Sequence, residues 1–220
     1  MQVCFDFVLF SFYTDVIISD SFSEQLKLIQ SGHVTASDLL DSIGPMSPLD
    51  WLGLVLLLDQ VPRNCFRGPA SKIAYTVFDP IALDVTLKAI EQRIPESPEI
   101  RYHPGYRLWF YLPLQHSERT DIHELSIKEH ASIFTDMKVL MNQPESEVDE
   151  KFKKTRDFLL ANKEGVEKWD GMLNSFAARH KAVVDRFGRF PHRNEAMGRE
   201  LTEEEVRYLA EGGETFGSGR

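Results

Sequence analysis

The sequence predicts an all-α protein in which helices that follow one another along the chain pack as antiparallel pairs. Apolar residues recur with helical spacing after residue 20, helix start signals precede several of these runs, and strand-like alternation is scarce there. The connections between the runs are short, which favours antiparallel neighbours. We expect a bundle of about eight helices. It forms one domain over residues 21–212, after an apolar segment at 1–20 and before a flexible tail at 213–220.

The first 18 residues are the most apolar stretch of the chain, but they do not read as a membrane span. Asp6 and Asp15 interrupt the stretch, and no Lys or Arg precedes it. A signal peptide has a basic start, and a membrane span needs roughly 20 uninterrupted apolar residues. We therefore favour a buried helix or strand over a targeting or anchoring segment.

Start and stop signals place the first helices of the domain. Residues 47–50 combine a cap hydroxyl, a proline and a carboxylate three positions after the cap, which predicts a helix that ends near Gln60, before Pro62. This helix is apolar nearly all round, so it should be enclosed by others. Asp79 and Pro80 repeat the start signal for a second helix.

Later helices follow from spacing and caps. Residues 104–112 form the third, which we expect Pro113 to end, and residues 121–141 form the fourth. Apolar residues recur at helical spacing over 148–159 and again over 166–187, where Gly188 is a left-handed C-terminal cap. Thr202 opens a capping box for a short helix that ends near Gly212.

Charge and cysteine usage restrict the partners. The chain carries 25 Lys and Arg against 34 Asp and Glu, a net charge of −9, so we expect neither nucleic acid nor a membrane as partner. Its two cysteines, Cys4 and Cys65, form no disulfide framework or zinc motif, which favours the cytoplasm. There is no phosphate-binding glycine loop, dinucleotide fingerprint or zinc-protease motif, so we expect no cofactor and no metal.

Two segments place polar residues where helices end. In residues 56–68, Asp59 ends an apolar helix and should pair with Arg63 or Arg67, either as a buried structural pair or beside a ligand. In residues 112–118, His116 and Glu118 could share acid–base work. Two further histidines, His123 and His130, follow His116 at intervals of seven residues. We expect both to lie on a solvated helix face.

The third segment, residues 186–199, reverses the charge of the chain. It holds a run of basic side chains against one acid, Glu195. Guanidinium groups beside exposed backbone amides bind a carboxylate or phosphate in bidentate fashion. The alternative is that they pair with internal acids and fix the C-terminal loop to the bundle. The basic residues are Arg186, Arg189, His192, Arg193 and Arg199.

These segments, in this order, resemble a bacterial and fungal family known as domain of unknown function 924. The resemblance is carried by LLLDQVPRNCFRG at 56–68, DPIAL at 79–83, YLPLQHSE at 111–118 and RHKAVVDRFGRFPHRN at 179–194, and it covers roughly 48–212. It implies a tetratricopeptide-like helical fold and no established reaction. Unlike family members, the chain has no Trp in its first 47 residues, and Gln115 precedes the histidine. The matching polar positions are Asp59, Gln60, Arg63, Asn64, Arg67, His116, Ser117, Glu118, His180, Arg189, His192, Arg193 and Asn194.

Two hypotheses follow. In the first, a pocket binds a small anionic carboxylate or phosphate and, if it is an enzyme, acts on it as a metal-free hydrolase or lyase. The ligand-binding residues would be Asp59, Arg63, Asn64, Arg67, Arg189, Arg193 and Asn194, and the catalytic ones His116, Glu118 and His192. The four arginines would hold the anion, His116 and His192 would act as acid and base, and Asp59 or Glu118 would orient an imidazole. In the second, the same residues are internal pairs in a non-enzymatic tetratricopeptide-like scaffold for a peptide or protein partner.

Overall fold

Helices make up the regular structure of the chain, which the computed structural model describes over residues 22–216. This range holds α-helices, short 3-10 turns and a π-helical stretch, and no strand, so the predicted all-α class is confirmed. The predicted apolar segment at 1–20, and residues 217–220 of the predicted tail, lie outside the described residues. The longer helices are one at 22–31, α3 (Ala36–Ile43), α4 (Pro48–Cys65), α6 (Asp79–Glu91), α7 (Pro104–His116), α8 (Thr120–Asn142), α9 (Glu150–Ala161), α10 (Lys163–Phe187) and α12 (Glu203–Ala210).

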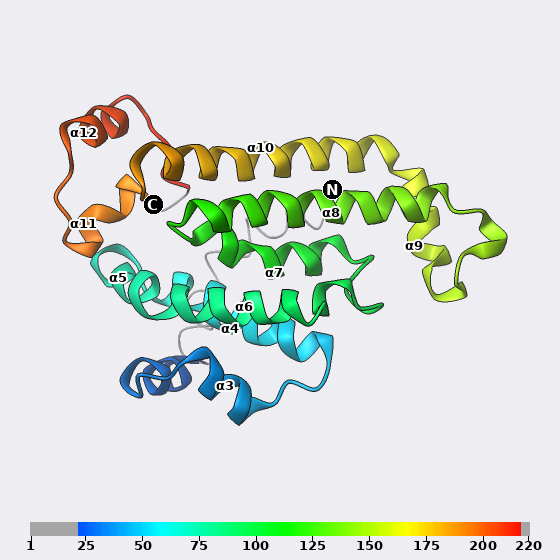
Figure 1. Cartoon of the computed structure of the whole chain (residues 1–220), viewed down its shortest axis with the longest axis horizontal. Coiled ribbons are helices and arrows are strands. Elements are labelled where there is room, and N and C mark those ends of the chain that lie inside the picture. Colours follow the sequence, from blue (N-terminus) through cyan, green and yellow to red (C-terminus); the bar gives the residue numbers. More distant parts are fainter. Residues whose placement is uncertain (1–21, 217–220) are drawn as a thin grey trace.

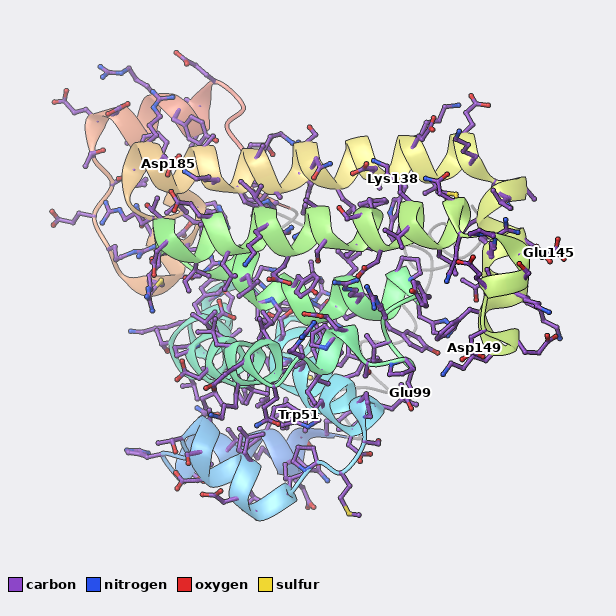
Figure 2. The ribbon with its side chains drawn as sticks, turned by 45° about the vertical axis from the view of Figure 1, so that its right-hand side comes forward. Trp51, Glu99, Lys138, Glu145, Asp149 and Asp185 are labelled. Carbon is purple, nitrogen blue, oxygen red and sulfur yellow. The ribbon has the colours of Figure 1, made fainter. Side chains whose placement is uncertain are left out.

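The two longest helices, α8 and α10, lie side by side along the length of the molecule (Figure 1). α7 packs on α8, and because only three residues separate them, the two run antiparallel. α4 and α6 pack on α7, and α3 packs on α6. At one end lies α9, where Glu145 and Asp149 project from the surface (Figure 2). At the other lie α12 and the short α11 (Asn194–Met197).

Local capping chemistry fixes the ends of several helices where the sequence predicts them. Ser47 and Thr202 both form complete capping boxes, with Asp50 and Glu205 as the returning carboxylates. Gly188 ends α10 at a φ of 67°, a left-handed conformation that glycine adopts without a Cβ clash. These predictions are confirmed, and they determine where the loop after α10 begins.

Two prolines lie inside helices instead of ending them, which corrects our prediction. α4 continues through Pro62 to Cys65, and α7 continues through Pro113 to His116. Each proline lies in the last turn, where it removes a single backbone hydrogen bond and interrupts no helix beyond it. As a result, His116 stands on the final turn of a helix and not in a loop.

The helix predicted from Asp79 and Pro80 starts earlier in the chain than expected. The helical run begins with α5 (Ser71–Ile73) and widens into the π-helix η2 (Ala74–Phe78) before α6. Pro80 has no N–H for an α-helical bond to Thr76, and the helix is in its π form immediately before it. Asp79 is therefore not an exposed cap, and its side chain is available to the interior.

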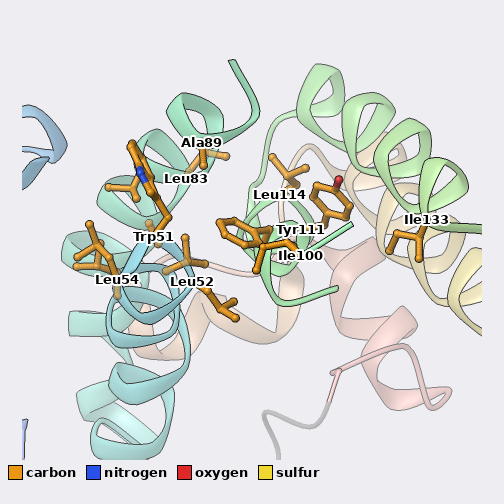
Figure 3. Packing of buried hydrophobic residues seen from close by; sticks show 14 of the residues in the cluster. Trp51, Leu52, Leu54, Leu83, Ala89, Ile100, Tyr111, Leu114 and Ile133 are labelled. Carbon is orange, nitrogen blue, oxygen red and sulfur yellow. The ribbon is translucent and has the colours of Figure 1, made fainter. Parts of the chain in front are cut away.

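The core lies between α4, α6, α7 and α8. Trp51 and Leu54 from α4 face α6, and Tyr111 from α7 faces Ile133 of α8 (Figure 3). Apolar residues lie on most sides of α4, which confirms that it is an enclosed helix. A second, smaller cluster joins the end of α10 to the C-terminal segment, and its buried members are Val183, Val184 and Phe190.

His123 and His130, predicted on a solvated face, are buried at 1% and 0% exposure. Both imidazoles are hydrogen-bonded near the end of α7. His123 Nε2 lies 2.8 Å from the Ser117 carbonyl oxygen, and His130 Nε2 lies 3.1 Å from the Gln115 amide nitrogen. The prediction was wrong because α8 is covered on two sides, by α7 and by α10. Among the described residues, we find no helix of sufficient length and apolarity to cross a membrane.

Candidate functional site

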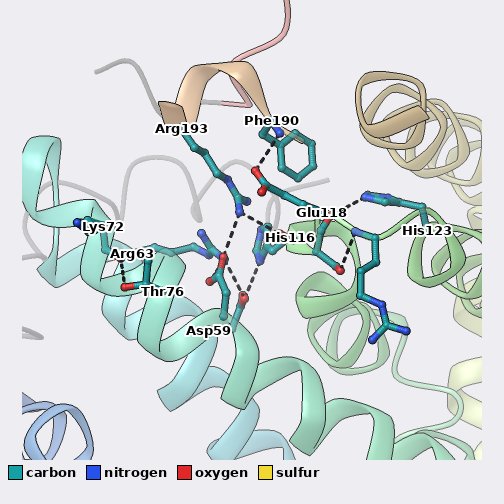
Figure 4. A network of polar contacts seen from close by, with 12 residues as sticks. Asp59, Arg63, Lys72, Thr76, His116, Glu118, His123, Phe190 and Arg193 are labelled. Atoms are coloured by element: carbon teal, nitrogen blue, oxygen red, sulfur yellow. Dashed lines mark hydrogen bonds and ion pairs between the residues drawn. The ribbon is translucent and has the colours of Figure 1, made fainter. Parts of the chain in front are cut away.

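Polar side chains from three distant segments meet where α4 and α7 end (Figure 4). Asp59 and Arg63 come from successive turns of α4, and His116 is the last residue of α7. Arg193 comes from the turn η5 (Pro191–Arg193), which follows α10. The fold thus brings together one or more candidates from each of the three segments that the sequence singled out.

His116 and Asp59 form a close pair. His116 Nδ1 lies 2.6 Å from Asp59 Oδ1, and the Asp59 side chain is 1% exposed. Because a carboxylate only accepts hydrogen bonds, the imidazole carries its proton on Nδ1 and leaves a lone pair on Nε2. No residue within 22–216 is hydrogen-bonded to that Nε2. This is the arrangement in which an acid holds an imidazole ready to take a proton.

The charges around the pair favour a neutral imidazole and an ionised carboxylate. Burial lowers the pKa of His116, and the nearby Arg63 lowers it further, while Asp59 acts in the opposite sense. Burial alone would raise the pKa of Asp59, but His116, Arg63 and Gln60 together hold it below its ordinary value. At neutral pH, His116 can therefore accept a proton and Asp59 cannot.

Asp79 joins the two arginines of the site. Its Oδ1 accepts from Arg63 Nη2 at 2.5 Å and its Oδ2 accepts from Arg193 Nη1 at 3.3 Å. Arg63 Nη2 also lies 3.3 Å from Asp59, and Arg193 Nη1 donates to the His116 carbonyl oxygen at 3.0 Å. Both guanidinium groups are thereby fixed beside the His116–Asp59 pair.

Arg193 is held more tightly than an exposed ligand contact would be. Its guanidinium lies 4.6 Å from the ring centroids of both Tyr75 and Phe190, and its side chain is 7% exposed. Removing a buried, paired and stacked cation costs on the order of 3 kcal/mol of stability. A truncation at Arg193 therefore tests folding as much as binding, and a conservative change elsewhere is the better probe.

Both arginines keep hydrogen-bond donors that no described residue accepts. Nε of Arg63 and Nε of Arg193 are buried without an acceptor. Arg63 Nη1 and Arg193 Nη2 likewise make no hydrogen bond to a residue within the described range. Nε of Arg101, Arg156 and Arg199 is also buried without an acceptor, but of these arginines only Arg63 and Arg193 line the cavity described below. Because buried donors are normally paired, these two guanidinium groups suit an oxygen-rich ligand there.

A cavity of about 620 Å³ adjoins these groups. Volumes of 300–1,000 Å³ are typical of small-molecule sites. Residues from 63–75 form one of its walls, residues from 176–216 form another, and His116 also lines it. The predicted site residues that line it are Arg63, Asn64, Arg67, His116, His192 and Arg193.

The wall from residues 176–216 is rich in rings. His180 stacks on Phe216 with centroids 3.5 Å apart, and Phe176 meets His180 edge-on at 4.5 Å. Burial lowers the pKa of His180 to about 3, and burial together with Arg193 lowers that of His192 to about 3. Both imidazoles are therefore neutral at physiological pH.

Other predicted candidates form internal pairs outside the cavity. Both carboxylate oxygens of Glu118 are bonded to Arg199, at 2.7 and 3.0 Å, and one also accepts from the Phe190 amide. Arg189 makes a bidentate pair with Glu205 at 2.7 and 2.8 Å. These contacts match the alternative that the basic segment fixes the C-terminal loop to the bundle.

Two further candidates lie behind the cavity wall. Asp59 contacts the lining residues His116 and Arg63 but does not line the cavity itself, and Asn194 is fully buried at the start of α11. The sequence analysis missed Asp79, which bridges the arginines, although its DPIAL motif was noted. It also missed the ring wall: His180 was noted only by resemblance, and neither Tyr75 nor Phe216 belongs to a recognisable motif.

Within residues 22–216, no three or more His, Cys, Asp or Glu side chains are grouped as ligands for a metal ion. The histidines of the site are separated in their contacts: His116 pairs with Asp59, and His180 bonds its own helix at the Phe176 carbonyl oxygen.

Comparison with known proteins gives a family and a fold relative. A family model described as a bacterial protein of unknown function, DUF924, matches residues 11–213. The solved structure of a protein of unknown function from Agrobacterium tumefaciens is 28% identical, with a TM-score of 0.57. The match covers 91% of this chain and 85% of that one. A search of curated proteins finds no match.

Proposed function

Since the chain belongs to the bacterial family DUF924, whose description states no reaction, we propose a function from the pocket itself: it binds a small molecule bearing a carboxylate or phosphate group. The observation that carries the proposal is the convergence of Arg63, Arg193 and the His116–Asp59 pair on one cavity. The guanidinium N–H groups that no described residue accepts would donate hydrogen bonds to the oxygens of the anion.

The charge balance favours a ligand with a single negative charge. Asp59 and Asp79 pair with Arg63 and Arg193, and the lining of the cavity also includes Arg67 and Glu195. Among the described residues, three arginines thus face three acids, which leaves no large positive field for a polyanion. Directed hydrogen bonds, rather than net charge, would hold the ligand.

The same pocket supports acid–base chemistry. Neutral His116, with Asp59 fixing its tautomer, would take a proton at Nε2 from water or from a carbon beside the anion. His192 is a second imidazole on the cavity, and its Nδ1 is buried without a partner. We assign the reaction to a metal-free hydrolase or lyase acting in the cytoplasm, the location that cysteine usage predicts.

A second candidate function is a tetratricopeptide-like scaffold for a peptide or protein. The pairs Glu118–Arg199 and Arg189–Glu205 favour it, because these basic residues of the C-terminal segment pair with internal acids instead of facing a ligand. This function needs no base at His116, so it predicts binding of a protein partner and no response to small anions.

Thermal unfolding of the purified full chain with phosphate, phosphorylated metabolites and di- and tricarboxylates tests the proposal. A ligand at 100 times its dissociation constant adds about 2.7 kcal/mol, which raises Tm by roughly 5–10 °C. Arg63→Lys keeps the charge beside Asp79 but loses the planar set of guanidinium N–H donors. It should therefore weaken binding at least tenfold. The control is Arg186→Lys, at a half-exposed arginine of α10 that pairs with Glu204.

Turnover is tested by Asp59→Asn, which keeps the size of the side chain and loses the charge that orients His116. We expect binding to persist and any turnover of a hit to fall by orders of magnitude, as expected when an imidazole loses its orienting acid. A panel without any shift, or a shift that is unchanged in Arg63→Lys, would contradict the pocket and favour the scaffold.

A further inference from the structure

The cavity is much larger than the anion that the arginines can hold. A water molecule takes about 30 Å³ of liquid volume, and an inorganic anion only a few times that. The cavity of about 620 Å³ therefore has room for an organic group attached to the anion. The following inference builds on the proposed function and concerns the chemistry of that organic group.

The wall from residues 176–216 is built mostly from rings. Phe176, His180, Phe190, His192 and Phe216 all border the cavity. They contact one another: Phe216 lies 5.7 Å from Phe190, 6.0 Å from Phe176 and 6.0 Å from His192, centroid to centroid. Such spacings belong to aromatic pairing, so the wall is one continuous aromatic surface.

The rings come from separate parts of the chain, so the surface is not a by-product of one helix. Phe176 and His180 stand one turn apart on α10, Phe190 and His192 belong to the following loop, and Phe216 returns after α12. Phe216 has a φ of 49°, a conformation that is unfavourable for a bulky side chain. Its ring stacks on His180 and lines the cavity.

We propose that the ligand is an aryl anion: a flat aromatic ring joined to one carboxylate or phosphate. The ring lies against Phe216 and Phe176, and the anion reaches Arg63 and Arg193 beside His116. A saturated ring of similar size would fill the volume but would lose the stacking on flat neighbours. The site therefore selects for planarity as well as for charge.

Matched ligand pairs test the selection by calorimetry on the full chain. We expect 3-phenylpropionate to bind about three- to tenfold more tightly than 3-cyclohexylpropionate, since an aromatic pair is worth about 0.5–1.5 kcal/mol. Phenyl phosphate and cyclohexyl phosphate repeat the comparison and show whether the anion is a phosphate or a carboxylate. The uncharged amide of 3-phenylpropionate should bind at least tenfold more weakly than the acid.

A variant pair locates the effect. Phe216→Leu keeps an apolar side chain and should remove most of the preference for the phenyl ligand. Phe158→Leu, the same change at a residue of α9 that is 62% exposed, should leave it intact. Equal affinity for phenyl and cyclohexyl ligands, or a preference that survives in Phe216→Leu, overturns this inference. Binding of the anion panel would still support the pocket, whereas failure of every anion would overturn both.

Discussion

Two buried arginine sites, that of Arg107 between α7 and α8 and that of Arg63 at the cavity, differ in how completely the described residues use the guanidinium donors. In the first, Arg107 is 1% exposed and all three of its nitrogens have partners: Nε donates to the Tyr111 hydroxyl at 3.1 Å, Nη2 to Ser132 at 2.8 Å, and Nη1 to Asp136. In the second, Arg63 is fixed by one nitrogen, and its Nε is buried without an acceptor. Arg101, which shares Asp136 with Arg107, also has a buried Nε without an acceptor, but it does not line the cavity.

The difference distinguishes an arginine that stabilises the fold, Arg107, from one that can bind a ligand, Arg63. A guanidinium whose donors are all used by the protein has nothing left for a ligand, and none of the residues around Arg107 lines the cavity described above. A guanidinium that is fixed by one nitrogen keeps its orientation and has donors to offer. Preorganised groups with unused donors are characteristic of binding sites, because the ligand then completes the network.

Arg107→Ala should cause the largest loss of stability, about 3–5 kcal/mol, because it leaves the Asp136 carboxylate largely buried without its inner partner. Urea denaturation of the full chain measures this loss. The partner that stays, Arg101, has a side chain that is 39% exposed and cannot replace it. Anion binding at the cavity should be unchanged whenever the variant is folded. A loss below about 1 kcal/mol would show that Arg107 does not stabilise the fold.

Acidification should weaken the cavity end first. His180 and His192 have folded pKa values of about 3 against an ordinary value near 6.5, so on acidification the unfolded chain binds protons before the folded one. Their stabilising effect is complete above about pH 6.5 and is lost as the pH falls toward 3. Between pH 6.5 and 5.5 the loss is about 1 kcal/mol for each imidazole, or about 2 kcal/mol together.

The Arg107 site provides the contrast in the same experiment. Burial raises the pKa of Asp136, but Arg101 and Arg107 outweigh burial and hold it below its ordinary value. Its contribution is therefore lost only as the pH falls below about 4. Burial also lowers the pKa of His123 and His130 of α8, so these two imidazoles add to the loss of stability over the same pH range. A free energy of unfolding that stays flat from pH 6.5 to 5.5 would contradict neutral, buried imidazoles at the cavity.

Helix ends were predictable from the sequence where they depend on neighbouring residues. Caps at Ser47, Thr202 and Gly188 depend on neighbouring residues, and these were predicted correctly from the sequence. Pro62 and Pro113 were misjudged because a proline is tolerated in a last turn, and the position of that turn depends on packing.

Pairing between distant residues was not predictable. The sequence indicated that Arg193 needed an acid or a ligand, but nothing local singled out Asp79, 114 positions away, as its acid. His123 and His130 looked exposed because their helix has polar neighbours, and only the packing of α7 and α10 against α8 buries them. Sequence motifs therefore identified the segments of the site, and tertiary contacts determined which members face the cavity.

Ser132→Ala should have the smallest effect on stability, and it tests the comparison most directly. It leaves Arg107 with an unbonded donor, as Arg63 has. Arg107 Nη2 would lose its acceptor, at a cost of about 1–2 kcal/mol for a buried donor left unpaired. Thr135→Ala on the same helix is the control, since Thr135 is exposed and bonds only to the Ala131 carbonyl oxygen. We expect that control to change stability by less than about 0.5 kcal/mol in chemical denaturation. If Ser132→Ala were equally silent, an unpaired guanidinium donor would carry no cost in this protein. The unused donors of Arg63 and Arg193 would then no longer indicate a ligand.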